Sequence, residues 1–496
     1  MEIFLSTITS ELILYSMIGM LVGVVAGAIP GLNGGMAMAL TLPLTFYMEP
    51  VSAQGLLIGM YVGGVSGGLI SGILIGVPGS PTSVMTTLDG HAMAKKGEAS
   101  RALSLGIGAS FTGGILGWLI LAFLSAPLAA VALNFGNFET TALVITGILL
   151  IAAVGSGSLS KALLAGALGA LCSIPGLDPI DATPRLTMGI KDLQSGFGLI
   201  PVILGVFAFA PILHDLLTNN SASPPQITAT KNMRKYFFEV LKYPGNLVRS
   251  SLIGTAIGAL PGVGAAIGAI VSYSIARISS KKSKTFGSGV PDGVVAAEAA
   301  NNATVMGALI PMISLGIPGS AADVILIAAL TLQNIQLGPL MIVDHPKEFY
   351  GIISAALIAN FAMLFFMLLA SRHLLIVLKM PKYILTPAIL FFCMVGTLTY
   401  SNNPFELWVF FGFAAIGMVF LSADIPLPAF IIGFVLTPIG EETVRAAMME
   451  SNGSLMPFIT RPVPLVLLSL SLLAVLWAAR QELQKRKLAS QTGEPV

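Results

Sequence analysis

The chain has 496 residues, of which 55% are hydrophobic and 10% are charged, and its formal net charge is +2. A soluble globular domain carries about 25% charged residues, so this composition is that of a protein embedded in a lipid bilayer. It excludes a nucleic-acid-binding protein, which needs a concentrated basic surface to neutralise phosphates. A membrane-spanning helix needs roughly 20 mostly apolar residues, so the chain has room for about a dozen spans.

Apolar segments follow one another along the chain, and each is expected to be a helix. In the first half they lie at 12–29, 34–47, 53–76, 102–124, 139–156, 160–175 and 197–217. A polar connector at 218–248, expected to be cytoplasmic, separates them from the second series. That series lies at 251–276, 294–316, 319–334, 350–370, 384–400, 406–422, 427–438 and 463–480, before a basic cytoplasmic tail at 481–496. The sequence therefore predicts an all-α polytopic membrane protein with halves at 1–217 and 249–480.

Two motifs occur once in each half, in the same order. The segment GVVAGAIPGL at 23–32 returns as GTAIGALPGV at 254–263, and GVPGS at 76–80 returns as GIPGS at 316–320. Either pair of motifs alone is weak evidence of a repeat, because short Gly/Pro matches arise easily in membrane helices. Their common order indicates a duplicated unit.

The positions of Lys and Arg predict how the two repeats are oriented, because cytoplasmic loops collect these residues. Arg249 and Arg277 flank the second Pro-Gly motif, which predicts a re-entrant helical hairpin at about 249–277. The equivalent hairpin at 12–47 is flanked by Glu11 and Glu49, so its ends are expected outside. The sequence therefore predicts two inverted-topology repeats, with the N-terminus in the periplasm and the C-terminus in the cytoplasm.

The Pro-Gly segments at 30–35 and 261–264 cannot remain regular helix, because Pro lacks an N–H and Gly adopts positive φ cheaply. Free backbone groups at membrane depth are tolerated only inside protein or beside a wet cavity. There, N–H groups at helix N-termini attract carboxylates, and free carbonyls at the hairpin tips could hold Na⁺. Broken helices in inverted repeats are typical of secondary transporters. The alternative is a kink or close helix packing.

Hydroxyl and amide groups lie beside or between these breaks. Ser80 and Ser320 offer oxygens to a carboxylate or to Na⁺, although serine in membrane helices often bonds its own backbone. Asn301 and Asn302 lie in an otherwise apolar helix and need polar partners, so the rival interpretation is that they join two helices.

Two carboxylates, Asp89 and Glu298, lie near predicted membrane segments, where ionisable groups are functional candidates. Asp89 precedes His91 and Lys95, so an interfacial salt bridge or helix cap is an equally good explanation. No HExxH, CxxC or Walker GxxxxGK[ST] motif occurs, and no metal site or cofactor is expected beyond the coupling ion. The two cysteines both lie in apolar runs and imply no disulfide.

Taken together, several segments resemble the large membrane subunit of the tripartite tricarboxylate transporter family. They are PGLNG at 30–34, the run GSPTSVMTTLDGHAMAKKG at 79–97, EAANNA at 298–303 and LGIPGS at 315–320. The resemblance covers most of the chain. It implies a bacterial inner-membrane subunit that works with a small membrane subunit and a periplasmic substrate-binding protein. The implied substrates are small organic carboxylates, which include citrate-like, dicarboxylic and aromatic acids, and the implied driving force is a gradient of Na⁺ or H⁺.

Carried over by position, the resemblance implies a set of residues around the substrate or the coupling ion. These residues are Gly31, Asn33, Ser80, Thr82, Gly262, Gly264, Gly319 and Ser320. Two other functions remain open: an ion channel, which can also use re-entrant loops and helix ends, and an integral membrane enzyme, which needs a clustered acid–base or metal set.

Overall fold

The computed structural model describes residues 2–29, 32–154, 158–178, 181–218, 233–260, 264–280, 283–370, 382–401 and 403–492. Nearly all of these residues are helical. One antiparallel pair of two-residue strands, β1 (Gly176–Leu177) and β2 (Pro184–Arg185), interrupts them. Eight of the described helices are long and apolar enough to cross a membrane, and seven further apolar helices are shorter. The expected all-α polytopic membrane fold is confirmed.

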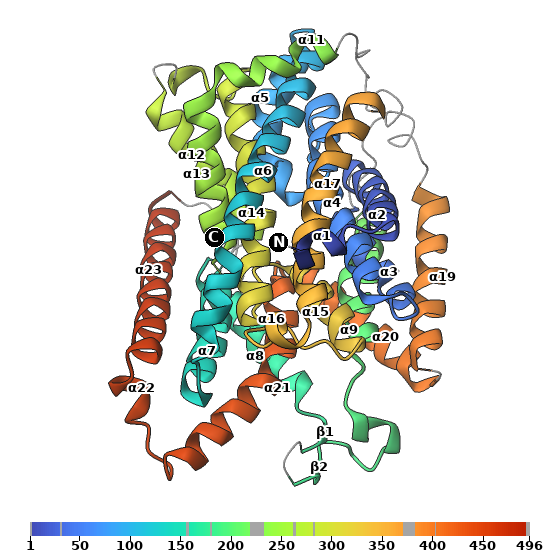
Figure 1. Ribbon diagram of the computed structural model, residues 1–496, viewed down its shortest axis with the longest axis vertical. Coiled ribbons are helices and arrows are strands. Elements are labelled where there is room, and N and C mark those ends of the chain that lie inside the picture. The colour runs from blue at the N-terminus through green and yellow to red at the C-terminus, as the bar shows by residue number, and fades with distance from the viewer. Residues whose placement is uncertain are drawn as a thin grey trace.

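The first half of the chain contains ten α-helices and the β1–β2 hairpin among its described residues (Figure 1). The helices are α1 (Glu2–Thr7), α2 (Ser10–Ala28), α3 (Gly34–Thr45), α4 (Pro50–Ile75), α5 (Val84–Lys95), α6 (Ala99–Ala132), α7 (Asn137–Val154), α8 (Leu159–Ser173), α9 (Leu199–Ile203) and α10 (Ala210–Leu217). Short 3-10 turns η1 (Pro81–Ser83) and η2 (Lys191–Ser195) precede α5 and α9, and the π-helical turn η3 (Leu204–Phe209) joins α9 to α10.

The described part of the second half begins with α11 (Met233–Phe237) and the 3-10 turn η4 (Phe238–Lys242). The turn η5 (Ser283–Thr285) lies between α13 and α14. The helices that follow η4 are α12 (Pro244–Gly258), α13 (Gly264–Ser279), α14 (Pro291–Leu315), α15 (Ala321–Leu332), α16 (Met341–Asp344), α17 (Pro346–Ala370), α19 (Lys382–Ser401), α20 (Phe405–Ser422), α21 (Leu427–Glu450), α22 (Pro457–Thr460) and α23 (Pro462–Thr492). Helix α23 continues past residue 480, so the expected tail boundary does not coincide with the end of a helix.

Both sequence motifs mark helix ends in both halves. The pairs α2/α3 and α12/α13 lie where hairpins were predicted, although the tip residues 30–31 and 261–263 are outside the described residues. Helix α4 ends at Gly76 with φ +74°, and α14 ends at Gly316 with φ +73°. This left-handed conformation is cheap for glycine alone, which explains why the motif begins with Gly in both halves.

The placement of the paired elements favours an inverted arrangement. Figure 1 places α5 near the top of the molecule and its counterpart α15 in the lower part, and it places α12 and α13 in the upper part, above α3. The inverted topology of the repeats stays a prediction.

Helices α4 and α14 form the centre of the structure. Their spans are 94% and 100% buried, whereas no other candidate span exceeds 50%. Helix α4 packs against α2 through facing glycines: a methyl group on Gly19, Gly23 or Gly27 would overlap a carbonyl oxygen of α4. Helix α14 packs on α12 in the same way: a methyl group on Gly254 or Gly258 of α12 would overlap a carbonyl oxygen of α14. Close backbone approach of this kind is the usual way in which membrane helices associate.

A second, smaller hydrophobic core adjoins this centre. It is formed mainly by α7, α8, α20 and α21, with Phe413, Phe420 and Phe430 among its buried side chains. Figure 1 shows these helices in the lower part of the molecule, while α4, α12, α13 and most of α14 lie above them. Helix α6, with 34 residues and thus about 50 Å long, extends from the upper part toward α7.

Charged residues gather toward the ends of the molecule. Arg185 and Arg445 both pair with Asp178 and Glu441, which ties the β1–β2 hairpin to α21 at the bottom of Figure 1. At the top, beside α11, Glu239 accepts hydrogen bonds from Arg101, and these lower the pKa of Glu239.

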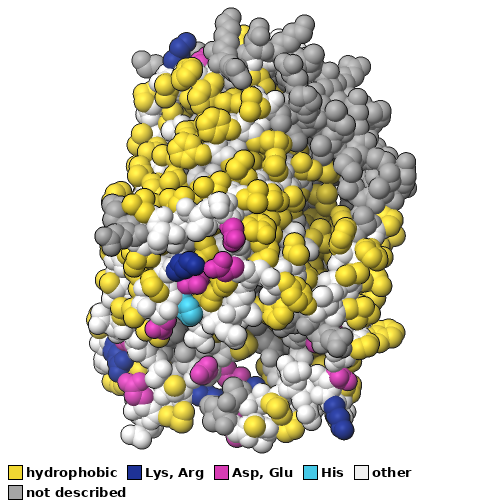
Figure 2. Space-filling model, turned by 45° about the vertical axis from the view of Figure 1, so that its right-hand side comes forward, with side chains coloured by type: hydrophobic (Ala, Val, Ile, Leu, Met, Phe, Trp, Pro, Cys, Tyr) yellow, Lys and Arg dark blue, Asp and Glu magenta, His cyan; other side chains and the backbone are white. Residues whose placement is uncertain are grey.

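Between these ends the surface is largely hydrophobic, as the face in Figure 2 shows. Charged side chains form only a few groups on that face, most of them in its lower half. A broad apolar surface suits contact with lipid. Which end faces the cytoplasm stays a prediction.

Candidate functional site

The candidate site is built around two short loops, residues 76–83 after α4 and 316–320 after α14. In the first loop, a methyl group on Gly79 would overlap the carbonyl oxygen of Gly27, at the end of α2. In the second, a methyl group on Gly319 would lie 2.8 Å from the carbonyl oxygen of Gly258, at the end of α12. Each loop is therefore pressed against the interrupted end of the neighbouring hairpin, which requires glycine at both positions.

The interrupted ends of the hairpins lie opposite the middles of the two buried helices. Gly34, which begins α3, is in close contact with Gly64 of α4, and Gly258, which ends α12, contacts the carbonyl of Thr304 in α14. Both partners are close to the midpoints of helices of 26 and 25 residues. Because these helices are long enough to cross the bilayer, the breaks lie near its midplane if α4 and α14 span it.

The structure describes two of the four residues predicted at the hairpin tips. Asn33 is the N-cap of α3, and its side-chain oxygen accepts a hydrogen bond from the N–H of Met36 at 2.9 Å. Gly264 is the first residue of α13. Gly31 and Gly262 lie outside the described residues, as does the possible Na⁺ position at the tips.

Hydroxyl groups of both loops lie beside other hydroxyls. Ser80 lies 2.7 Å from the hydroxyl of Thr82 and 3.1 Å from that of Ser83. Ser320 is the N-cap of α15, and its hydroxyl lies 2.7 Å from the hydroxyl of Tyr61 in α4. The second contact joins the two halves of the chain.

The two asparagines of α14 are buried and face α4. The side chain of Asn302 exchanges hydrogen bonds with the hydroxyl of Ser66 at 2.9 and 3.1 Å, which favours the interpretation that it joins two helices. Asn301 donates to the carbonyl of Val65 at 3.5 Å, and its own oxygen has no hydrogen-bond partner among the described atoms. Asn301 is thus the asparagine with an available polar atom.

The contact between Ser66 and Asn302 also bears on the alternative that the chain is an integral membrane enzyme. Residues 64–68, GVSGG, fit the GxSxG pattern of serine hydrolases. That pattern needs a sharp turn between a strand and a helix to expose the serine. Here Ser66 lies inside α4, fully buried and bonded to Asn302, so the match has no structural support.

Both predicted carboxylates are fully buried and hydrogen-bonded. Asp89 accepts from the hydroxyl of Tyr273 at 2.8 Å and from the N–H groups of Gly287, Gly289 and Val290 at 2.7 to 2.9 Å. It therefore ties α5 to the segment that precedes α14, which favours its interpretation as a cap. No ion pair of Asp89 occurs among the described residues.

Glu298 connects three helices. Its carboxylate accepts from Thr86 of α5 and, at 2.7 Å, from Ser110 of α6. Hydrogen bonds to a carboxylate lower the cost of burying its charge. This environment explains how an acidic residue is accommodated in the middle of the molecule.

The structure adds two residues that the sequence analysis missed, Tyr61 and Asp323. Asp323 is fully buried in the first turn of α15, and neither of its carboxylate oxygens has a hydrogen-bond partner among the described atoms. The signal was present in the sequence, because Asp323 is the only acidic residue in the apolar run at 319–334. Within the described parts of the chain, no group of three or more His, Cys, Asp or Glu side chains is placed to hold a metal ion.

The model of the family described as the tripartite tricarboxylate transporter TctA family matches residues 13–432. An uncharacterized 52.8 kDa protein of Agrobacterium vitis, in the TAR-I ttuC' 3' region, is 32% identical over 413 residues, which cover 83% of this chain and 82% of the relative. An uncharacterized protein in the TAR-II ttuC' 3' region of the same organism is 33% identical over 234 residues, covering 47% and 97%. No solved structure matches the chain.

Proposed function

The chain belongs to the tripartite tricarboxylate transporter TctA family, and on this basis we propose that it is the translocating subunit of a secondary transporter for small organic carboxylates. Its partners are a periplasmic substrate-binding protein, which delivers the carboxylate, and a small membrane subunit. Uptake is coupled to a gradient of Na⁺ or H⁺. The substrate is a tricarboxylate such as citrate, or a related dicarboxylate or aromatic acid.

The paired helix breaks are the observation that supports this proposal most strongly. In both halves a hairpin is interrupted opposite the middle of a buried helix, and a Gly-x-Pro-Gly-Ser loop lies against its end. Helices α3 and α15 begin at these places, with Asn33 and Ser320 as their caps. Helix N-termini favour anions, and broken helices near the midplane mark the binding sites of secondary transporters.

The proposed placement is the bacterial inner membrane, with the N-terminus in the periplasm and the C-terminus in the cytoplasm. It is supported by the separation of charges along the molecule. In the expected orientation Arg185, Arg445 and Arg461 face the periplasm, and they lie in or beside β2, α21 and α22, all at the bottom of Figure 1. Lys95 faces the cytoplasm in that orientation, and it ends α5 near the top.

Uptake into proteoliposomes tests the proposal. The subunit is reconstituted with the small membrane subunit and the binding protein, and accumulation of labelled carboxylates, citrate first, is measured with and without an inward Na⁺ gradient. We expect saturable accumulation that needs the gradient and the binding protein. Downhill flux that neither saturates nor needs partners would point to a channel, and chemical conversion of the label without accumulation would point to an enzyme.

A further inference from the structure

Asp323 differs from Asp89 and Glu298 in that neither of its carboxylate oxygens has a hydrogen-bond partner. Asp89 and Glu298 both accept hydrogen bonds from side chains or backbone N–H groups. Asp323 is equally buried, yet both of its oxygens lack a hydrogen bond, and no Lys, Arg or His pairs with it within the described chain. A carboxylate in this situation is costly unless another group compensates its charge.

A structural role in capping α15 does not account for this carboxylate. Ser320 and Asp323 have the spacing of a capping box, and the Ser320 hydroxyl accepts from the N–H of Asp323 at 3.4 Å. In a complete box the carboxylate accepts from the N–H of the cap residue. Here neither carboxylate oxygen of Asp323 accepts a hydrogen bond from the Ser320 N–H or from any other described group. Only half of the box is therefore formed.

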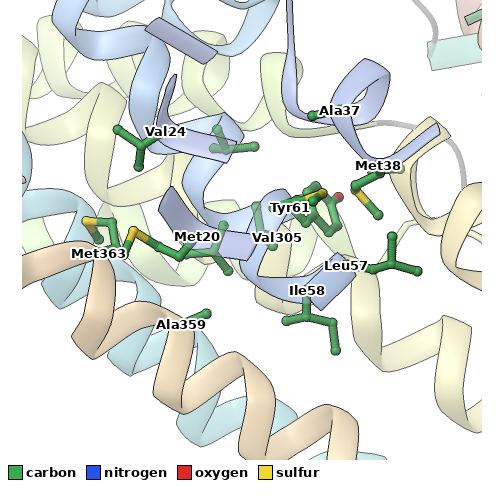
Figure 3. Close-up of a cluster of buried hydrophobic side chains, with 14 of the residues drawn as sticks. Met20, Val24, Ala37, Met38, Leu57, Ile58, Tyr61, Val305, Ala359 and Met363 are labelled. Carbon is green, nitrogen blue, oxygen red and sulfur yellow. The ribbon is translucent and has the colours of Figure 1, made fainter. Parts of the chain in front are cut away.

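Two hydroxyl groups lie beside Asp323. The Ser320 hydroxyl is 3.4 Å from the backbone nitrogen of Asp323, and the Tyr61 hydroxyl of α4 lies 2.7 Å from that of Ser320. Figure 3 shows Tyr61 among buried apolar side chains, including Leu57, Met38 and Val305. The environment thus combines one negative charge and two hydroxyls inside an apolar core, which is the ligand chemistry of a hard cation.

We propose that Asp323, the Ser320 hydroxyl and the Tyr61 hydroxyl bind Na⁺, and that this is the coupling ion. The inference rests on the proposed function and names the ion and its ligands. The proposed Na⁺ site lies at the start of α15, whereas the sequence suggested a site at the Pro-Gly tips. Because Gly319 lies against the end of α12, an ion bound here is adjacent to the hairpin that the proposed substrate site includes.

The site belongs to one half of the molecule only. Counted from the paired Gly-x-Pro-Gly-Ser loops, the position that corresponds to Asp323 in the first half is Ser83. Ser83 is buried and bonded to Ser80, and it carries no charge. The carboxylate therefore supplies a ligand that the duplicated motif itself does not contain, which predicts a single carboxylate-bound Na⁺ per subunit.

Thermal unfolding of the purified subunit, without substrate or partners, tests this proposal. Tm is measured against increasing NaCl, with KCl or choline chloride keeping the ionic strength constant, because an ion that binds only the folded state raises Tm. We expect Na⁺ to raise Tm of the wild type in a saturable way that K⁺ does not reproduce. In Asp323→Asn the half-maximal Na⁺ concentration rises at least about tenfold or the response disappears, since the only charged ligand is lost.

Two further variants keep the test decisive. Tyr61→Phe removes one hydroxyl and keeps the ring, so it is expected to fold and to weaken the Na⁺ response even if Asp323→Asn does not fold. Glu298→Gln is the matched control, because it changes a buried carboxylate whose oxygens already have hydrogen-bond partners. We expect this variant to have a lower Tm than the wild type, and we expect Na⁺ to raise that Tm as it does in the wild type. A wild-type Na⁺ response in Asp323→Asn or Tyr61→Phe, or the absence of any Na⁺-specific response in the wild type, overturns the proposal.

Failure of this inference is distinguishable from failure of the proposed function. Na⁺-specific stabilisation without uptake of any carboxylate overturns the transport proposal and leaves the ion site standing. Carboxylate uptake that is driven equally well without Na⁺ overturns the coupling role of this site and leaves carboxylate transport standing.

Discussion

At the scale of single residues, burial alone says little about what a carboxylate does. Asp89, Glu298 and Asp323 are all fully buried. Asp89 closes a gap between α5 and the segment before α14, Glu298 joins α14 to α5 and α6, and Asp323 joins nothing. The partners separate these roles, because a hydrogen-bonded carboxylate stabilises the fold, whereas an unpartnered one is costly to bury as a charge.

The role of Asp89 as a cap can be tested by Asp89→Asn. The change removes the negative charge of a carboxylate that accepts hydrogen bonds from three backbone N–H groups and a tyrosine hydroxyl. A hydrogen bond to a charged group contributes about 1.5–3 kcal/mol to stability. We expect a lower Tm and lower yield, with an unchanged response to Na⁺. Glu98→Gln is the control, since Glu98 pairs with Arg101 at the surface. A selective loss of cation dependence in Asp89→Asn would instead place Asp89 in the ion site.

At the scale of helices, the packing of α2 on α4 depends on glycines that face carbonyl groups across the interface. From α2, Gly19, Gly23 and Gly27 contact the backbone of α4, and from α4, Gly59, Gly63 and Gly67 contact the backbone of α2. Their spacing of four residues places each set on one face of its helix. The glycines within these helix bodies are therefore packing residues, and the predicted site concerns only the helix breaks.

Gly23→Ala measures the strength of this interface. A methyl group at Gly23 would overlap the carbonyl of Met60, so the helices must move apart, and overpacking of this kind costs about 1–3 kcal/mol. Gly412→Ala in α20 is the matched control, because nothing lies within 4 Å of its added methyl group. There we expect a gain of about 0.5–1 kcal/mol from the better helix former. Equal Tm changes in the two variants would show that close approach does not determine stability at Gly23.

At the scale of the whole molecule, two hydrophobic cores meet beside the candidate site. The larger core surrounds α4 and α14, and the smaller is built mainly from α7, α8, α20 and α21. The loop after α14 lies at their junction, where Ile317 approaches Gly147 of α7. Alternating access requires one part of such a molecule to move against another, and this contact is a place where that movement can be tested.

A cross-link across this junction tests whether such movement accompanies transport. A methyl group on Gly147 would lie 3.4 Å from the Cγ2 atom of Ile317, so Gly147→Cys and Ile317→Cys place two side chains within reach of a disulfide. Cys172 and Cys393 are first replaced by alanine. We expect oxidation to abolish uptake and reductant to restore it, while each single cysteine variant is unaffected by oxidation. Undiminished uptake by the oxidised protein would mean that the two cores do not separate at this contact.

The sequence by itself determined the membrane class, the helical content, the order of the paired breaks and most helix positions. These features follow from local rules: a bilayer forces backbone groups to bond within a helix, and Pro and Gly interrupt helices wherever they stand. Tertiary structure alone decided which polar residues have partners. Tyr61 meets Ser320, and Asp89 meets residues 287–290. Contacts between residues so far apart in the chain depend on how the helices pack, and this is why only the folded molecule shows that the Asp323 carboxylate has no partner.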